Sequence, residues 1–296
     1  MKAFLNKYSH WVMLFPFLAC FVLFILLPVL ASALLSFTKF DSVSWPQLVW
    51  LKNYIDIFTA DKIFFQKVLP NTITYALIVG PGGYILSFLL AWVLAQLGKT
   101  LRTVLAIIIY SPSMLGSVAL ATIWSVLFSG DKGGYLNSVL ISLGVMNEPV
   151  AWLTSSETLL PIMIFVAMWS SMGVGFLAML SGVLNVDREL YEAAYLDGVK
   201  NRFQEIIYVT IPSMRPQMLF GAVMALVGTF NSPGLGVMLS GSNPTPGYGG
   251  QLIINHIDDY GFLRYEMGYA SALCVVLLIF VWLSSRGAYK LFEDKD

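Results

Sequence analysis

Side chains that could do chemistry together are scarce in this 296-residue sequence. His256, Asp258 and Asp259 form its only dense titratable cluster, a group that in principle binds metal or transfers protons. One histidine and two adjacent acids do not converge on one helical or strand face, so we expect solvated loop charges there. Cys20 and Cys274 lie inside apolar runs without partners at ligand spacing. The sequence therefore predicts neither a zinc site nor a disulfide framework.

One short segment resembles part of a nucleotide-binding loop. Gly98-Lys99-Thr100 has the ending of a P-loop, but Val93 stands where the first glycine is required. The segment also closes a long apolar run, so we expect it to be structural. We therefore expect that the chain is not an enzyme and binds no cofactor of its own, and that any ATP chemistry comes from another protein.

Long apolar segments of the sequence must position its functional residues. Hydrophobic residues make up 57% of the sequence and charged residues 11%, whereas soluble domains carry about 25% charged residues. A bilayer core about 30 Å thick needs roughly 20 apolar helical residues, and six charge-free runs approach or exceed this length. These runs cover residues 11–37, 72–97, 104–128, 159–184, 218–239 and 267–283. The pattern predicts an all-α integral membrane protein with six transmembrane helices.

Basic residues predict the orientation of these spans. Eleven of the 17 Lys and Arg residues fall on the side that includes both termini, and six fall on the other. Because cytoplasmic loops are enriched in Lys and Arg, we expect a multi-pass protein of the cytoplasmic membrane with both termini inside. A zero net charge without charged blocks argues against nucleic-acid binding. Residues 11–30 already exceed the apolar core of a signal peptide, so we interpret them as a span.

The connection at residues 185–215 is the longest on the cytoplasmic side. Apolar residues at three- and four-residue spacing predict a helix that Asp187 caps and Gly198 ends. A second short helix is predicted at residues 201–209, stopped by Pro212. Two helices joined by a glycine turn outside the membrane are typical of an interfacial helix pair or of a docking surface for a cytoplasmic partner.

Two other segments each allow two interpretations. The fifth run contains Asn231-Ser232-Pro233-Gly234, which breaks a helix. This break is either a kink relieved by a neighbouring helix or part of a substrate path, where Phe230 offers a stacking face and Asn231 a hydrogen-bonding amide. The aromatic-rich connection at residues 39–70 is either an anchor at the outer membrane interface or a docking surface for an external protein.

Several motifs together carry a family resemblance. Glu192-Ala193-Ala194, Gly198 and Ile211-Pro212 resemble the EAA loop of integral membrane subunits of binding-protein-dependent ABC importers. From about residue 50 onward the chain is similar to sugar permeases related to the maltose-type first permease subunit. The further motifs that carry this similarity are residues 50–54, Asn71-Thr72, Trp124, residues 134–137, Trp152-Leu153 and residues 268–272.

The resemblance implies a fold, a mechanism and partners. It implies the type I ABC importer permease fold over a single domain, residues 1–296, with residues 185–215 as the coupling loop to an ATPase. The implied ATPase-coupling residues are Glu192, Ala193, Ala194, Asp197 and Gly198. The implied partners are a second permease subunit, more often a different protein than a copy, two ATP-binding subunits that hold ATP and Mg, an extracellular solute-binding protein and membrane lipid.

Two departures from the family pattern concern this loop. Ten residues separate Gly198 from Val209, where the family usually has nine, so the second helix is expected in a slightly different register. Asp187 also stands where the family often has proline, and a capping side chain can serve the same purpose.

The resemblance also implies a substrate path. Phe230 and Asn231 match a Phe-Asn element that lines the sugar site of the maltose-type relatives, and Trp169 and Ser171 are further candidates on the fourth span. Core packing is the alternative for Trp169. A neutral sugar is expected because no span carries a charge that could neutralise an anion. A secondary transporter or an ABC permease for a non-sugar solute remains the alternative, although the spans lack the acids and histidines that usually couple ions.

Overall fold

The computed structural model describes residues 13–230 and 234–292, with side chains described as far as residue 287. In this part of the chain the structure is helical, apart from one antiparallel pair of two-residue strands, β1 (Thr38–Lys39) and β2 (Gln47–Leu48). Contacts divide the chain into two compact units. The first comprises Met1–Lys62 and His256–Ile279, and the second comprises Ile63–Asn255 and Phe280–Asp296.

The first unit carries one helix at each end of its sequence. Its first helix runs from Met13 to Leu35 and includes a π-helical turn, η1 (Val22–Leu26), followed by α2 (Leu27–Leu35). Pro28 lies just after this turn and has no N–H to donate, which is a common cause of such irregularity. The remaining elements are α3 (Lys52–Thr59), the end of α15 (Ile253–Asp258), the π-helical turn η6 (Asp259–Leu263) and α16 (Met267–Phe292) as far as Ile279.

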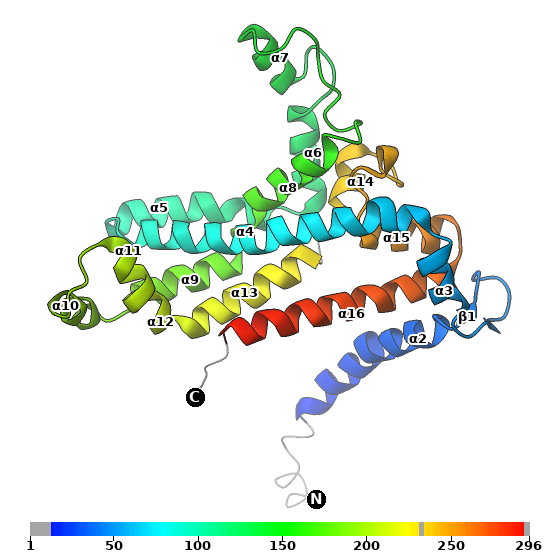
Figure 1. Cartoon of the computed structure of the whole chain (residues 1–296), viewed down its shortest axis with the longest axis horizontal. Helices are drawn as coiled ribbons and strands as arrows, with labels where there is room; N and C mark the ends of the chain where they lie inside the picture. The colour runs from blue at the N-terminus through cyan, green and yellow to red at the C-terminus, as the bar shows by residue number, and fades with distance from the viewer. Residues whose placement is uncertain (1–12, 231–233, 293–296) are drawn as a thin grey trace, which may run out of the picture. The chain divides into compact units, whose positions relative to one another are not determined.

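Three helices form the centre of the second unit. These are α4 (Leu69–Ala95), α9 (Val174–Leu184) and α13 (Arg215–Phe230), which pack against one another (Figure 1). The backbones of α9 and α13 are close at Gly175, where an added Cβ would lie 3.4 Å from Gly221 Cα of α13. Two buried apolar clusters result, one around Met163 and Leu159 and the other around Phe176 and Met179.

Shorter elements complete the second unit. Helices α10 (Arg188–Leu196) and α11 (Arg202–Glu205) lie at one end of it, on the left in Figure 1, whereas α7 (Tyr135–Ser142) projects at the top of the view. The shorter elements before residue 186 are η2 (Phe64–Val68), α5 (Lys99–Tyr110), η3 (Ser111–Met114), α6 (Ser117–Leu127), α7 (Tyr135–Ser142) and α8 (Leu159–Ser170). Those after it are α10 (Arg188–Leu196), α11 (Arg202–Glu205), η4 (Ile206–Thr210), α12 (Ile211–Ser213), α14 (Leu235–Ser240) and η5 (Pro246–Tyr248).

Fewer helices are long and apolar enough to cross a membrane than the six runs predicted. Within the described residues there are three, at Met13–Leu35, Phe64–Ala95 and Met267–Gly287. The number rises to five if each of two bent helix pairs counts as one span. The fifth predicted run, 218–239, contributes the 16-residue α13 and then the short α14, so the six-span count stays a prediction.

Two predicted spans are broken instead of continuous. In the run 104–128, α5 and η3 meet α6 at an angle of 99°. Pro112 provides no N–H for an α-helical hydrogen bond, and Gly116 is extended as the N-cap of α6, which explains the break. In the run 159–184, α8 and α9 meet at 45°, with Gly173 as the N-cap of α9.

Candidate functional site

The first helix of the 185–215 connection has the boundaries that the sequence predicted. The Asp187 carboxylate accepts a hydrogen bond from the Glu189 N–H at 3.1 Å and caps α10. Gly198 follows the helix with a φ of +97°, and the N–H groups of Val199 and Gly198 donate to the carbonyls of Ala194 and Tyr195. These two bonds form a Schellman motif, which requires the left-handed residue that glycine supplies without strain.

The second helix departs from its predicted end. Asn201 caps it by accepting a hydrogen bond from the Gln204 N–H at 2.8 Å, but Pro212 does not stop it. The chain instead widens into the π-helical turn η4 and continues as α12, so that Pro212 lies in the first turn of α12. A proline at this position is tolerated because the first N–H groups of a helix have no intrahelical partner.

Side-chain hydrogen bonds join the two helices of this connection. The Tyr195 hydroxyl of α10 donates to Glu205 Oε1, and Arg202 Nη1 donates to Glu205 Oε2 at 2.8 Å. Four residues earlier on the same face of α10, the Tyr191 hydroxyl lies 2.9 Å from Thr210 Oγ1. Glu205 is 2% exposed and Thr210 is fully buried. Burial by itself would raise the pKa of Glu205. The hydrogen bonds from Tyr195 and Arg202 instead hold the pKa of Glu205 below its usual value, so the carboxylate is charged.

The opposite face of α10 is exposed. Glu192 and Ala193 are exposed, and Leu196 is 91% exposed. Asp197 and Gly198 are also exposed, whereas Ala194 is half-buried on the flank. The predicted coupling residues therefore lie together on one short helix and its C-terminal turn.

A cavity of about 320 Å³ lies inside the second unit. Residues of α4, α6, α8, α9, α13 and α14 line it, and none of the lining side chains is charged. Its polar lining residues are Tyr75, Tyr84, Ser87, Ser117, Ser170, Ser171 and Thr229. Phe176 and the two tyrosines add aromatic surface, and small residues such as Gly228 leave the space open. Hydroxyls and aromatic rings without charge suit a neutral, hydroxyl-rich ligand.

One of the predicted substrate-path residues lines this cavity, and two others lie outside its lining. Ser171 lines it and donates to the Met168 carbonyl at 2.7 Å. Trp169 lies outside the lining, in edge-to-face contact with Trp124 at 5.2 Å between ring centroids. Phe230 follows the lining residue Thr229 at the end of α13 and contacts the Phe280 ring edge-to-face at 5.7 Å. Asn231 lies outside the described residues.

Several motif residues that lacked an assigned role fix the connections between helices. The Asn137 amide donates to the carbonyls of Ser129, Asp131 and Val150 and accepts from the Trp152 indole N–H at 2.7 Å. Similarly, Asn53 donates to the carbonyls of Ser36 and Thr38 at 2.8 and 2.9 Å, and Asn71 donates to three carbonyls of the 248–251 segment. Asn53, Asn71 and Asn137 lie in the first turns of α3, α4 and α7, and the sequence does not show which backbone carbonyls the fold brings to them.

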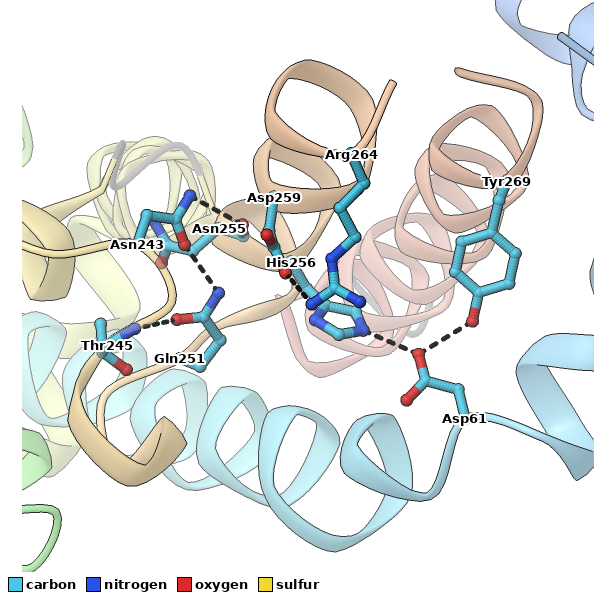
Figure 2. Close-up of polar contacts among 9 residues, drawn as sticks. All are labelled: Asp61, Asn243, Thr245, Gln251, Asn255, His256, Asp259, Arg264 and Tyr269. Carbon is cyan, nitrogen blue, oxygen red and sulfur yellow. Dashed lines mark hydrogen bonds and ion pairs between the residues drawn. The ribbon is translucent and has the colours of Figure 1, made fainter. Parts of the chain in front are cut away.

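Of the three residues that the sequence predicted to be solvated loop charges, Asp258 is exposed, but His256 and Asp259 are not. His256 and Asp259 are 1% and 3% exposed. In the first unit, His256 Nε2 lies 2.8 Å from Asp61 Oδ2, and the Tyr269 hydroxyl donates to the same oxygen at 2.9 Å (Figure 2). Asp259 pairs with Arg264 at 2.6 Å. The prediction was wrong because the partners are distant in sequence, and burial requires each charge to be paired.

A neutral amide network fixes the end of the second unit. Gln251, which is fully buried, donates to Asn243 Oδ1 at 3.0 Å and accepts from the Thr245 N–H at 2.8 Å (Figure 2). Thr72 of α4 accepts from the Ile253 N–H at 3.0 Å. Within the described residues, no group of three or more His, Cys, Asp or Glu side chains could hold a metal ion.

Comparison with known proteins places these features in one family. Residues 83–295 match the family described as the inner membrane component of binding-protein-dependent transport systems. The chain belongs to this family. It is therefore an inner-membrane permease component of an ABC transporter, as the EAA-type motif implied.

Named relatives and solved structures agree with this assignment. The chain is 30% identical to a probable ABC transporter permease protein, YurN of Bacillus subtilis, over 97% of both chains. It is 27% identical to the arabinooligosaccharides permease AraP of the same organism, covering 97% of this chain and 89% of AraP. A chain in the crystal structure of a bacterial ABC transporter for the acidic polysaccharide alginate shares its fold, with a TM-score of 0.80, 22% identity and 99% coverage of both chains.

Proposed function

We propose that this permease forms half of the translocation path for a neutral sugar or oligosaccharide, and that ATP hydrolysis in partner subunits drives the transport. The 185–215 connection is the coupling loop in this proposal and lies in the cytoplasm with both termini. The observation that carries it is the pair of capped helices with Glu192, Ala193 and Leu196 exposed on one face.

The coupling loop supplies what an ATPase would need to move the spans. Its last helical piece, α12, is separated only by Met214 from α13, and α13 lines the cavity. A displacement of α10 would therefore reach the cavity wall through a short, largely helical path. Two ATP-binding subunits holding ATP and Mg would close together and draw two such loops together, one from this chain and one from a second permease subunit.

The composition of the cavity supports a neutral substrate. Burying an acidic sugar among uncharged side chains would leave its carboxylate without a counter-ion, which is costly in a low-dielectric site. Two relatives are named for the transport of arabinooligosaccharides and of lactose, which carry no charged groups, whereas the alginate transporter imports an acidic polysaccharide. We propose Ser171 and Phe230, with Asn231, as contacts along the path, and assign Trp169 to aromatic packing against Trp124.

External delivery of the solute completes the proposed transport cycle. A related transporter has been crystallised with a periplasmic protein that holds an alginate pentasaccharide. A solute-binding protein with a neutral glycan would serve the present chain in the same way, by docking on the connections that Asn53, Asn71 and Asn137 fix.

Purification and transport together test this function. The tagged chain, purified from its native membrane, should bring down a second permease and ATP-binding subunits. In vesicles, the complex with its binding protein should accumulate neutral oligosaccharides only when ATP is supplied, and uronate oligomers should not compete. Uptake that persists without ATP but stops with a proton or sodium uncoupler would instead indicate a secondary transporter. ATP-driven uptake of uronates or of a non-sugar solute would overturn the substrate class alone.

A further inference from the structure

The packing of α10 raises the question of what holds this helix in place. Within the described chain, α10 has no buried residue, and Tyr191 and Ala194 are among the few that are even half-buried. A helix of nine residues is too short to be stable alone in water. Apolar packing therefore contributes little to the orientation of α10. Hydrogen bonds from α10 to the neighbouring elements must fix this orientation.

Glu205 is the residue where those bonds meet. Its carboxylate accepts from Tyr195 on α10 and from Arg202 on its own helix, and its backbone carbonyl accepts from Thr210 Oγ1 at 3.3 Å. Thr210 in turn bonds Tyr191 on α10 at 2.9 Å. Both tyrosines thus connect α10 to one buried residue, directly or through a single side chain.

The same bonds set which face of α10 points outward. Tyr191 and Tyr195 are four residues apart and so share one face, while Ala193 lies roughly opposite them at about 100° per residue. Holding the tyrosine face against Glu205 therefore presents Ala193 and Leu196 on the outside. Rotation of α10 by one residue would turn these side chains away from any partner that docks there.

We propose that Glu205 is a positioning residue for energy coupling: it locks α10 to the α11–η4 segment, so that a force on α10 moves α13. This inference rests on the proposed function, since it assigns to Glu205 a part in the ATPase-driven motion. Glu205 itself is buried and does not reach the ATPase. It acts only through Tyr195, Arg202 and Thr210.

A double-mutant cycle tests this role. Tyr195→Phe removes one hydroxyl, and Glu205→Gln removes the charge while keeping the side-chain volume. Loss of one hydrogen bond to a charged group changes the balance between locked and unlocked loops by about tenfold. We expect each variant to lower the solute transported per ATP hydrolysed by up to that factor. The double variant should be no worse than the more affected single variant, because Tyr195→Phe removes the donor of the Tyr195–Glu205 bond and Glu205→Gln removes the charge that strengthens the same bond.

The assembled complex provides the controls. Tyr208→Phe, in the same loop but with an exposed ring, should keep the transport ratio of the parent, and all variants should still co-purify with the ATP-binding subunits. Spin labels at Glu189→Cys and Phe203→Cys, on a background without Cys20 and Cys274, should show a broader distance distribution in Tyr195→Phe. A parental ratio and an unchanged distribution in Glu205→Gln and Tyr195→Phe would overturn the inference. Absence of ATP-driven uptake in the parent would overturn the proposed function instead.

Discussion

Gly198 has the left-handed conformation that joins the two helices of the proposed coupling loop. Its φ is +97°, and an added Cβ would have no heavy atom within 4 Å. The backbone conformation, and not a lack of space, is therefore what disfavours other residues at this position. A side chain in this region costs about 1–2 kcal/mol, and more when it is β-branched. Gly198→Val should therefore alter the turn without creating a clash.

We expect Gly198→Val to uncouple transport from ATP hydrolysis while the protein still inserts in the membrane. Uptake and ATPase activity measured on the same vesicles test this expectation. Gly144→Val is a matched control, since Gly144 also has a positive φ of +68°, no nearby atoms and an exposed position, but lies in another loop. Normal uptake in Gly198→Val would contradict the role of this turn.

Asp61 is a second residue whose replacement has a defined consequence. Its Oδ2 serves both His256 and Tyr269, and the side chains of Asp61 and His256 are only 6% and 1% exposed. Asp61→Ala leaves two buried donors without this acceptor, at about 1–3 kcal/mol for each group. Thermal unfolding in detergent should show a clear loss of stability. Asp258→Asn changes an exposed neighbour of the same cluster and should leave the melting temperature within the error of the measurement.

Sequence reasoning succeeded at residues whose function is local. Asp187 and Gly198 act on backbone groups within a few positions, so capping and turn preferences identify them directly. It failed at His256, whose partner Asp61 is 195 residues away. It also gave no indication of Glu205, because a glutamate near a helix start is ordinary in sequence and only the fold buries it against Tyr195.

At the scale of elements, breaks in the helices shape the cavity. Ser117 follows the break at Gly116, and Ser171 and Gly173 lie in the break between α8 and α9. Leu235 is the first residue of α14, after the end of α13. All four residues line the cavity. Hydropathy located the apolar runs that contain these elements. It could not predict the 99° and 45° bends, because the apolar composition continues across them.

Filling the cavity tests whether it belongs to the transport path. Gly228 lines it, and a Cβ added there would have no neighbour within 4 Å, so Gly228→Leu places new volume in empty space. We expect this variant to assemble normally but to lose uptake by about tenfold or more, since the substrate would have to displace a side chain. Gly98→Leu, also in open space but outside the cavity lining, serves as the control. Parental uptake by Gly228→Leu would exclude the cavity from the path.

At the scale of the whole molecule, the proposed function assigns both energy and enclosure to partner subunits. The sequence contains no complete P-loop, in agreement with this proposal. Composition, charge distribution and the EAA-type motif were enough to predict the class of protein, which the family match confirms. The substrate could not be predicted to the same depth, because it depends on a few uncharged side chains that the fold brings together.

The central claim is that the exposed face of α10 contacts an ATP-binding subunit in the cytoplasm. A photo-crosslinking amino acid at Ala193, on the full-length chain in intact cells, tests this contact directly. We expect irradiation to link the chain to an ATP-binding protein, and the same probe at Val43, which is 93% exposed in the first unit, to give no such product. Crosslinks from Ala193 to lipid or to an extracellular protein, with no ATP-binding subunit among the products, would contradict the account.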